Sequence, residues 1–391
     1  MRAWPGSPRP APSWRAEASK VLPLAEALRR HVPDGTSVCL GAALECLIPF
    51  AAAHELIRQG RRDLTLIGPI SDVCFDQLIA AGCVRRVIAA WVGNVQHGTG
   101  YGFRRAVEAA VPRPLEVEDH SNLTIALGLE AAALGVPYLP TRSLLGSDIL
   151  ARSRSLRTAS CPFSGEPLVL VPAIAPDVAI LHVQRADAGG SCQAWGPTGV
   201  AAAAGKASRQ VIVVCEELVS PHVIRSDPNR TLVPGFRVAA VVPLPGGAHP
   251  SPVQGYFGRD HAAYAEYHRR TATAEDARIW LDEWVLSVPD HAAYLAKLGA
   301  ARLNGLRPRH PRLAAPVDYA GRALHARGTD GRGGRPGDRR RRGRVRRDAA
   351  TAPRLLPRSL DARADGHRPL RERDHPGQPP SRVSRDDVRR A

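Results

Sequence analysis

Short apolar runs alternate with amphipathic stretches along most of the chain, and residues 63–79 give the clearest example. Leu64–Ile67 is a short, partly β-branched apolar run of the kind that forms a buried strand. Gly68-Pro69 ends this strand, because glycine tolerates positive φ and proline cannot donate a ladder hydrogen bond. Ser71-Asp72 then provides an N-cap for a helix with an apolar face. The pattern therefore predicts a strand, a tight turn and a helix.

The same alternation recurs on both sides of this stretch. Further strands are expected at 37–40, 84–91, 115–117, 168–171, 178–183, 211–215 and 238–242, and further helices at 22–28, 48–57, 103–110, 121–134, 259–270, 274–286 and 290–303. Apolar strands that alternate with amphipathic helices predict an α/β fold with a mostly parallel, doubly wound sheet. Ligands of such sheets bind just beyond the carboxyl ends of the strands, where the turn at 68–72 is expected to lie.

The pattern is confined to the middle of the chain. Residues 1–18 are rich in Pro, Arg and Trp without periodicity, and we interpret them as a disordered extension or as the product of a misassigned start codon. Order is expected from 19 to 310, in one domain. Among residues 313–391, Leu, Ile, Val and Phe number 10 of 79, which is below what a packed core needs. We therefore expect 311–391 to be a disordered basic tail.

The net charge of +17 suggests a nucleic-acid binder, but its distribution argues against this for the body of the protein. From residue 301 onward there are 25 Arg against 10 acidic residues, so the first 300 residues carry a net charge of only +2. A rival hypothesis is that the Arg-rich tail itself binds nucleic acid. The tail has no aromatic residue after Tyr319 to stack on bases, which disfavours this hypothesis.

The seven cysteines indicate a reducing compartment. They form no Cys-x-x-Cys pair, so zinc-ribbon and redox motifs are absent from the sequence, and an odd, unpatterned set is typical of the cytoplasm. The N-terminus lacks the apolar core of a signal peptide. No apolar run approaches the length of a membrane span. We therefore expect a cytoplasmic protein without a membrane partner.

Several motifs that carry chemistry in other proteins are only imitated here. The stretch 199–207 has one residue too many between its glycines for a phosphate-binding loop, and Ala207 stands where a hydroxyl is required, so we expect an alanine-rich helix. His249, His261 and His268 lack the carboxylates or cysteines that would support a metal site, and no metal is expected. In Glu118–Ser121 two carboxylates, a His and a hydroxyl meet between a strand and a helix. These residues either cap the helix or line a site, and both interpretations stay open.

Nine segments follow one another in a characteristic order. They are LGAALECLIP (40–49), DLTLIGPISDVCFDQLI (63–79), EVEDHSN (116–122), AALGVPYLP (132–140), LGSDIL (145–150), DVAILHVQRAD (177–187), CEELVS (215–220), GGAHPSPVQGYFGRDHAAY (246–264) and EWVLSVPDHAAYLAKLGAARL (283–303). This order resembles the family I coenzyme A transferases, in particular the A (alpha) subunit of the glutaconate CoA-transferase type. The resemblance covers residues 19–307 and depends on order and spacing rather than on any single motif.

The resemblance implies a reaction through an acyl-glutamyl anhydride and then a glutamyl-CoA thioester. A carboxylate attacks the thioester, becomes acylated, and is regenerated when the acceptor acid takes the CoA. In the glutaconate type, the nucleophilic Glu belongs to the B subunit, where Gly follows it two residues later. No Glu of this chain has Gly at that position. The resemblance thus implies a hetero-oligomer with a B subunit, a coenzyme A thioester as substrate, no permanently bound cofactor and no catalytic residue in this chain.

The expected contribution of this chain is a set of backbone N–H groups and glycine loops that line the acyl and CoA site. The resemblance leads us to nominate Gly41, Gly68, Ser71, Gly93, Asn94, Glu118 and Ser121 as substrate- and CoA-binding residues. The chain departs from many relatives at Gly41-Ala42, where they have paired glycines. A close alternative is a subunit of the ring-opening CoA-thioester hydrolases of steroid breakdown, which share the EEL and GGAH segments. The acyl group and the acceptor stay open.

The Arg- and Pro-rich tail has one further interpretation. Such composition is common in an out-of-frame reading of a GC-rich gene, so we expect 311–391 to be a frameshifted reading of the partner gene. Codons permitted for Leu370–Pro376, read one base later, give Tyr-Glu-Ser-Gly-Thr-Ile, which resembles the Glu-containing segment of B subunits. The alternative is a genuine Arg-rich tail.

Overall fold

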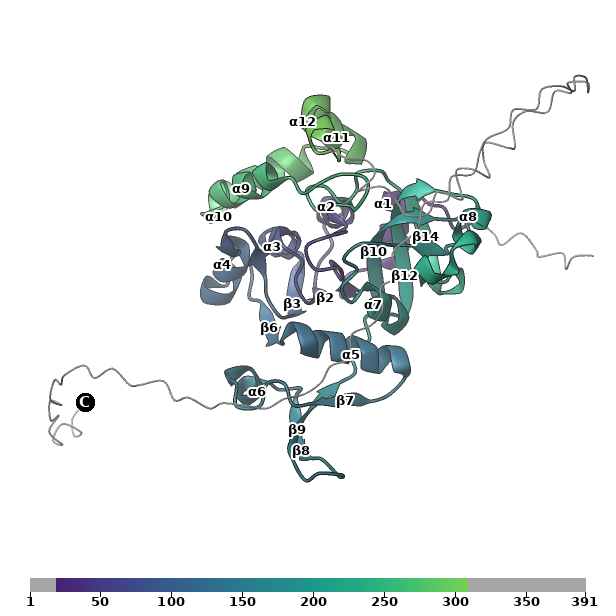
Figure 1. Cartoon of the computed structure of the whole chain (residues 1–391). Helices are drawn as coiled ribbons and strands as arrows, with labels where there is room; N and C mark the ends of the chain where they lie inside the picture. Colours follow the sequence, from purple (N-terminus) through teal and green to yellow (C-terminus); the bar gives the residue numbers. More distant parts are fainter. Residues whose placement is uncertain (1–18, 309–391) are drawn as a thin grey trace, which may run out of the picture. The chain divides into compact units, whose positions relative to one another are not determined.

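The computed structural model describes residues 19–308, and its main feature is a largely parallel sheet (Figure 1). Within these residues, seven parallel strands lie in the order β14–β12–β10–β1–β2–β3–β6. Their bounds are β1 Ser37–Cys39, β2 Leu64–Gly68, β3 Val84–Ala89, β6 Glu116–Asp119, β10 Val178–Ala186, β12 Gln210–Leu218 and β14 Val238–Pro243. Two short strands, β11 (Cys192–Gln193) and β13 (Thr231–Val233), extend the end of β10 in antiparallel fashion. The predicted α/β fold with a mostly parallel sheet is confirmed.

The strand order creates a switch point beside β1. The chain adds β2, β3 and β6 outward from β1 on one side, and then returns to place β10, β12 and β14 on the other side. The loops that follow β1 and β10 therefore leave the sheet at neighbouring positions. The connection from β10 continues through β11, and its last residue before the next helix, Val200, donates its N–H to the Ala42 carbonyl oxygen in the loop after β1 at 2.7 Å. Ligands of open α/β sheets bind at such a point.

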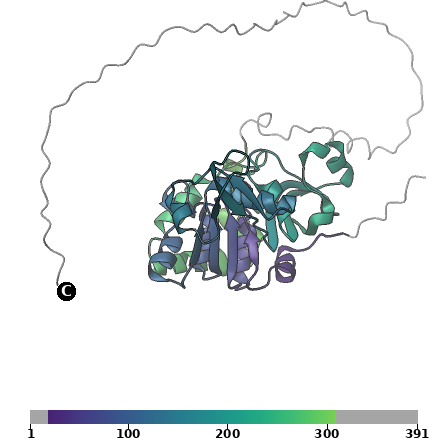
Figure 2. The same cartoon turned by 90° about the horizontal axis from the view of Figure 1, so that it is seen from below.

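Helices cover both faces of the sheet, which leaves the central strands buried. One core joins the strands to the first four helices, and the other joins them to α5 and α7. The bounds are α1 Leu24–His31, α2 Phe50–Arg58, α3 Val73–Ala80, α4 Tyr101–Ala109, α5 Asn122–Leu134, α7 Ala201–Ala207 and α8 Pro221–Ser226. Every residue of β10 is buried, as expected for a strand covered on both faces. In Figure 2 the strands of the first half of the chain lie side by side in purple and blue.

A second, smaller sheet corrects one part of the predicted pattern. The run predicted at 168–171 is a strand, β9 (Pro167–Pro172), but it lies in an antiparallel sheet of order β7–β9–β8 and not in the main sheet. Strands β7 (Tyr138–Thr141) and β8 (Arg157–Ser160) and the short helix α6 (Asp148–Arg152) have no counterpart among the predicted elements. Every residue of β8 is exposed, so it shows no apolar alternation that a sequence pattern could detect. In Figure 1 this sheet lies beside α5, away from the main sheet.

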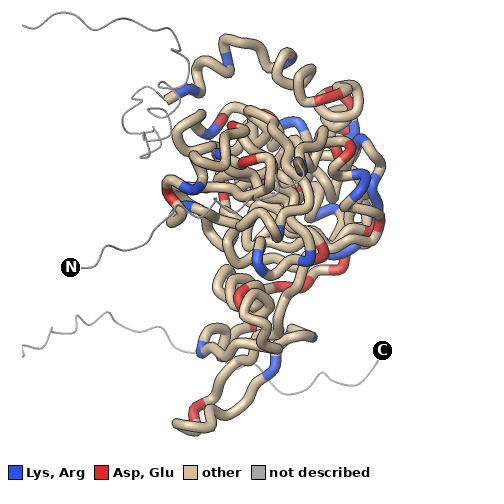
Figure 3. Tube along the Cα trace, turned by 90° about the vertical axis from the view of Figure 1, so that its right-hand side faces the viewer, with Lys and Arg blue, Asp and Glu red and all other residues tan. Residues whose placement is uncertain are grey.

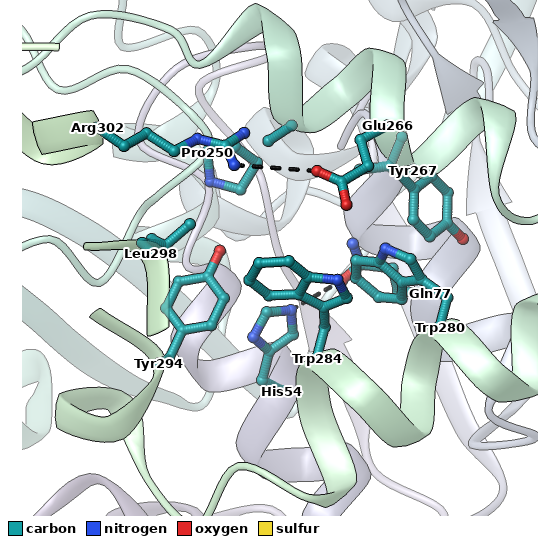
Figure 4. Close-up of a pocket in the computed structure, with 12 residues that line it drawn as sticks. His54, Gln77, Pro250, Glu266, Tyr267, Trp280, Trp284, Tyr294, Leu298 and Arg302 are labelled. Atoms are coloured by element: carbon teal, nitrogen blue, oxygen red, sulfur yellow. Dashed lines mark hydrogen bonds and ion pairs between the residues drawn. The ribbon is translucent and has the colours of Figure 1, made fainter. Parts of the chain in front are cut away.

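The last helices pack over α2 and α3. They are α9 His261–Arg269, α10 Ala274–Leu281, a π turn at Asp282–Leu286, α11 His291–Leu298 and α12 Ala300–Gly305. The helix predicted at 290–303 is interrupted at Gly299, where φ is +83°. A cavity of about 30 Å³, large enough for one water molecule, lies beneath these helices (Figure 4). The His54 imidazole and Gln77 amide are hydrogen-bonded at 3.0 Å in its wall, so the cavity belongs to the helical core.

The charged residues of the described chain are mixed in sign. Figure 3 shows Lys and Arg interspersed with Asp and Glu along the trace. None of the helices between residues 19 and 308 is long and apolar enough to cross a membrane. The segments predicted to be disordered, 1–18 and 311–391, lie outside the described residues.

Candidate functional site

The turn after β2 lies at the carboxyl edge of the parallel sheet, in contact with the loop that follows β1. The Ser71 hydroxyl donates to the Leu40 carbonyl oxygen at 2.8 Å. Gly41 has φ +64°, and a Cβ built on it would lie 2.8 Å from the Cβ of Ser71. A Cβ on Gly68 would lie 2.7 Å from the Leu40 carbonyl oxygen. The structure therefore brings Gly41, Gly68 and Ser71 together, and both glycines are required by the close approach of the two loops.

The hairpin that follows β3 completes this part of the edge. Its strands are β4 (Gly93–Asn94) and β5 (Gly98–Thr99). The Trp91 N–H donates to the Pro69 carbonyl oxygen at 3.2 Å, so the hairpin starts beside the turn after β2. Gly93 lies against its partner strand, where a Cβ would come within 2.5 Å of the Gly98 carbonyl oxygen. The buried Asn94 amide donates to the Tyr264 carbonyl oxygen at 2.8 Å. Asn94 thus ties the hairpin to α9.

Glu118 and Ser121 lie further along the same edge, on the strand that pairs with β3 and just after it. The carboxylate of Glu118 pairs with Arg86 and lies 3.2 Å from His120 Nε2. The hydrogen bond with His120, and then those with Ser155 and Arg86, lower the pKa of Glu118 to about 2 against the effect of burial. The Ser121 hydroxyl accepts the Thr124 N–H at 3.1 Å and caps α5. Of the two interpretations of this stretch, helix capping describes Ser121, while Glu118 is an ionised, paired carboxylate.

A cavity of about 440 Å³ lies between the end of β6 and α6. Its lining residues are Arg86, Glu116, Val117, Glu118, Asp119, Asp148, Ile149, Arg152, Ser153 and Arg154. Three guanidinium groups and four carboxylates share this wall, so the cavity offers partners for both signs of charge. The seven nominated residues therefore form two groups, one around Ser71 and the hairpin, and one at the end of β6, which is separated from β2 by β3.

Asp72 and Arg259 form a buried ion pair that the sequence pattern does not reveal. The pattern marks Asp72 only as a helix cap and does not single out Arg259. Asp72 is fully buried at the turn after β2, and its carboxylate pairs with the guanidinium of Arg259. Arg259 also lies 3.7 Å from the carboxylate of Glu45, in the loop after β1. A carboxylate buried beside a turn requires a cation or several N–H donors as partners. This rule predicts that Asp72 has a partner, but it does not identify Arg259 among the arginines of the chain.

Glu216 is a second position that the sequence pattern does not single out. Its carboxylate accepts the Gly246 N–H at 2.8 Å and lies 2.7 Å from His182 Nε2, deep in the sheet. The Ser251 hydroxyl donates to the Glu45 carbonyl oxygen at 2.8 Å. These contacts fix the glycine-containing loop at 246–251 beside the loop that follows β1. The EEL and GGAH segments are therefore parts of one assembly at the carboxyl edge.

The reactive side chains near Ser71 are not arranged as nucleophiles. The Ser71 hydroxyl is buried and its proton is committed to a carbonyl oxygen. Burial, and then the charge of Glu45, raise the pKa of the Cys46 thiol, so little thiolate is present at neutral pH. Among residues 19–308, no cluster of three or more His, Cys, Asp or Glu side chains is placed to bind a metal ion. Neither the Ser71 hydroxyl nor the Cys46 thiol is therefore activated for attack, while the close-packed loops around them can position a ligand.

Most of the described chain is similar to known coenzyme A transferases. The family model described as coenzyme A transferase matches residues 21–243, more than half of the chain. The chain is 36% identical over 284 residues to the A subunit of 3-oxoadipate CoA-transferase from Pseudomonas knackmussii, covering 73% of this chain and 100% of that protein. It is 35% identical over 306 residues to the A subunit of glutaconate CoA-transferase from Acidaminococcus fermentans, covering 74% and 95%.

A solved structure and a more distant relative extend the comparison. The crystal structure of glutaconate coenzyme A-transferase from Acidaminococcus fermentans matches with a TM-score of 0.71 at 34% identity, covering 77% of this chain and 99% of that one. The IpdA subunit of the cholesterol ring-cleaving hydrolase from Mycobacterium tuberculosis is 28% identical over 275 residues, covering 65% of this chain and 89% of that protein.

Proposed function

The chain belongs to the coenzyme A transferase family, and on that premise we propose that it is the A subunit of a two-component enzyme that moves CoA from a small acyl-CoA to a carboxylate acceptor. The observation that carries this proposal is the match, over the full length of the relative, to a protein named as the A subunit of such an enzyme. A chain that aligns with one complete subunit requires the other to complete the enzyme. The expected partner is a B subunit in a hetero-oligomer.

In the proposed mechanism the B subunit supplies the nucleophile. Its Glu carboxylate attacks the thioester carbonyl carbon and CoA leaves as the thiolate, which gives an acyl-glutamyl anhydride. The thiolate then attacks the glutamyl carbonyl of the anhydride, which releases the first acid and forms the glutamyl-CoA thioester. The acceptor carboxylate reverses these two steps. This proposal is supported by the sequence, in which no Glu is followed two residues later by Gly.

The proposed role of this chain is to hold the acyl and CoA groups against the partner's carboxylate. The turn around Ser71 and the hairpin at 93–99 provide close-packed backbone at the switch point of the sheet, where its N–H dipoles are fixed in advance. Glu118, ionised in the wall of the adjacent cavity, lines the same edge. We include Ser121 with the binding residues through its cap of α5, which orients the segment that follows Glu118.

For the substrate we propose a short acyl-CoA whose acyl group carries a second carboxylate. The relatives are named for 3-oxoadipate and glutaconate, and both acids are dicarboxylates. Arg152 and Arg154 in the cavity wall are the guanidinium groups that would pair with such a carboxylate.

We propose that the enzyme acts in the cytoplasm, and the seven free cysteines are consistent with that compartment.

The test is an assay of this chain purified with its B subunit. Acyl-CoAs with and without a second carboxylate are mixed with a panel of free acids, and the new thioesters are measured by mass spectrometry. Transfer of CoA between acids supports the proposal. An assembled complex that transfers no CoA with any member of the panel contradicts it.

A hydrolase subunit is the second candidate, favoured by the match to the IpdA subunit of a cholesterol ring-cleaving hydrolase. The same assay separates the two functions. Both reactions leave the total thioester unchanged, but a transferase moves CoA from one acid to another, whereas opening of a ring consumes water and leaves the product on the same CoA with a new carboxylate. We favour the transferase because the relatives named for it are more similar in sequence and are covered more completely.

A further inference from the structure

The carboxylate of Asp72 joins three segments of the carboxyl edge. Oδ1 accepts the Val73 N–H and the Val95 N–H, each at 3.1 Å, and so connects the start of α3 to the hairpin. Oδ2 pairs with Arg259 Nη2, in the segment between the loop at 246–251 and α9. Both oxygens are in use and the side chain is completely buried. The Asp72 carboxylate is therefore bonded to the start of α3, to the hairpin and to the segment before α9.

The backbone of Asp72 is strained. Its φ of +47° and ψ of −144° lie in a region that side chains with a Cβ rarely adopt, at a cost of about 1–3 kcal/mol. A glycine at this position would adopt the same conformation at lower cost. The chain nevertheless has an Asp here, so the side chain provides an interaction that outweighs the strain. Strain of this kind persists where the surrounding structure fixes the residue, and it is concentrated at functional sites.

The guanidinium of Arg259 is held on two sides. It lies 3.7 Å from the centre of the Tyr264 ring and it pairs with Asp72. Its neighbour in sequence, Asp260, lies 2.9 Å from His249 Nε2 and 2.6 Å from Arg302 Nε, so the backbone around Arg259 is fixed as well. A planar group that is both stacked and paired keeps one orientation. Arg259 therefore couples the position of α9, through Tyr264, to the position of the turn after β2, through Asp72.

We infer that Asp72 and Arg259 form a positioning pair for the transfer site: their ion pair holds the turn at 68–72, the hairpin at 93–99 and the segment at 246–260 in one relative arrangement. This inference rests on the proposed function. Neither side chain is placed to react with a substrate. The pair acts through the backbone of Ser71 and Gly93, which is the part of the edge proposed to face the acyl-CoA. Small displacements of such groups are costly, because about 1 Å of misplacement reduces turnover by about 100-fold.

The two members of the pair depend on each other. Burial raises the pKa of Asp72, and the charge of Arg259 opposes this effect. Removing one member therefore leaves the other as an uncompensated buried group, which is more damaging than removing both. The pair should thus behave as a unit in mutagenesis, with the combined effect of two substitutions smaller than the product of their separate effects.

The experiment compares Asp72→Asn, Arg259→Gln, Arg259→Lys and the double variant D72N/R259Q in the complex with the B subunit. The D72N side chain keeps an oxygen for the two N–H donors but loses the charge, and the R259K side chain keeps the charge but loses the planar fork. We expect the kcat of D72N to fall by about 10- to 100-fold with KM changed by less than about twofold. We expect the double variant to lie within about threefold of D72N. R259K should fold and lose several-fold in kcat.

Asp177→Asn is the matched control. The Asp177 carboxylate also joins two segments, accepting the Ser37 N–H at 3.0 Å and the Ser37 hydroxyl at 2.6 Å, but at the amino ends of β1 and β10. This variant should lose stability and keep its kcat within about twofold. The inference is wrong if the kcat of D72N falls no more than that of D177N at a comparable loss of melting temperature. It is also wrong if the fold-reduction in kcat of the double variant equals the product of the reductions in D72N and R259Q.

A second measurement uses this chain alone and does not require transfer activity. In R259K, amide hydrogen exchange should accelerate in peptides covering 93–99 and 255–263, while peptides covering β10 keep the wild-type rate. Unchanged exchange at 93–99 in a folded variant contradicts the positioning role. If the wild-type complex moves no CoA but this acceleration is seen, the proposed function fails and the mechanical link between the three segments stands.

Discussion

Ser71 occupies the space that a side chain on Gly41 would require. The Ser71 hydroxyl donates to the carbonyl oxygen of the residue before Gly41, at 2.8 Å, and Gly41 itself has φ +64°. The loops after β1 and β2 can approach this closely only because one of them has no Cβ at the point of contact. The relationship gives a direct test of the site.

Gly41→Ala should impair both stability and transfer. The new Cβ would overlap the Ser71 side chain, and the left-handed backbone adds its own cost, so we expect the free energy of unfolding to fall by about 1–3 kcal/mol. The kcat of the complex should fall by about tenfold or more because Ser71 is displaced. Urea titration and steady-state kinetics measure the two effects.

Gly35→Ala is the control for this substitution. Gly35 has φ +79°, and a Cβ on it would meet nothing within 4 Å. The free energy of unfolding of this variant should fall by about 1 kcal/mol, because of the backbone conformation alone, and its kcat should stay unchanged. Equal kcat values for the two variants would contradict the role assigned to the Ser71 turn.

The isolated chain should have no transferase activity. Its nucleophile is proposed to belong to the B subunit, and neither the Ser71 hydroxyl nor the Cys46 thiol is activated to replace it. We expect turnover of the purified chain to be indistinguishable from buffer, and activity to appear once the B subunit is added. Robust CoA exchange by the chain alone would contradict its proposed place in a two-component enzyme.

Glu118 should make stability depend on acid pH. Its pKa is about 2 in the folded protein against an ordinary value of 4.5, so it binds protons more weakly when folded. The resulting stability is fully present above pH 4.5 and is lost as the pH falls from 4.5 toward 2. Glu118→Gln should therefore lower the free energy of unfolding by about 1–2 kcal/mol at pH 7, allowing for partial exposure, and by progressively less below about pH 4.5.

Asp148→Asn provides the comparison for the acid-pH effect. Asp148 lines the same cavity, but its side chain is 90% exposed and its ion pair with Arg152 is 3.9 Å long. The variant should change stability by less than about 0.5 kcal/mol at every pH. Urea midpoints measured between about pH 3 and pH 7 give both curves. If the free energies of unfolding of wild type and E118Q differed by the same amount at every pH in this range, the lowered pKa of Glu118 would be contradicted.

Removal of residues 311–391 should leave the fold intact. The composition of this segment predicts no packed core, so the melting temperature should change by less than about 2 °C, which corresponds to less than about 1 kcal/mol. Truncation after 298 is the comparison, because it removes Arg302, whose Nε lies 2.6 Å from Asp260. That shorter chain should melt several degrees lower. A similar drop for the first truncation would show that the tail packs on the body.

The DNA encoding 311–391 should contain sequence of the partner gene in another reading frame. The prediction follows from the Arg and Pro content of the segment and from the codons that Leu370–Pro376 permits. Resequencing of the gene decides the matter. One confirmed continuous frame, with stops or no Glu-x-Gly in the shifted frame, would leave the Arg-rich tail as a genuine part of the protein.

The elements of the main sheet could be predicted because its central strands are buried on both faces. Runs such as Val211–Cys215 are apolar throughout, and the helices between them carry a clear apolar face. Strand β9 of the small sheet was predicted as a strand, but β7 and β8 escaped prediction because none of their residues is buried. Arg157–Ser160 is held by backbone hydrogen bonds to β9, which leave no trace in the order of side chains.

The candidate site could be predicted only in part, for a related reason. Gly41 and Gly68 are visible as glycines at the ends of predicted strands, where turns require them. The partnership of Asp72 with Arg259 joins positions 187 residues apart, and no local pattern specifies it. Long-range ion pairs depend on the packing of α9 against the sheet, which follows from the whole fold and not from either segment.

The position of β1 at the centre of the sheet affects how the protein folds while it is being synthesised on the ribosome. Val38 pairs with Leu66 on one side but with Val178 on the other, 140 residues later in the chain. At about 5–20 residues per second, roughly 7–30 s pass between synthesis of the two strands. Throughout that interval the far edge of β1 has no native partner, although it is apolar and ready to pair. The emerging chain is therefore exposed to mispairing until β10 arrives, and slower translation between them would lengthen the exposure.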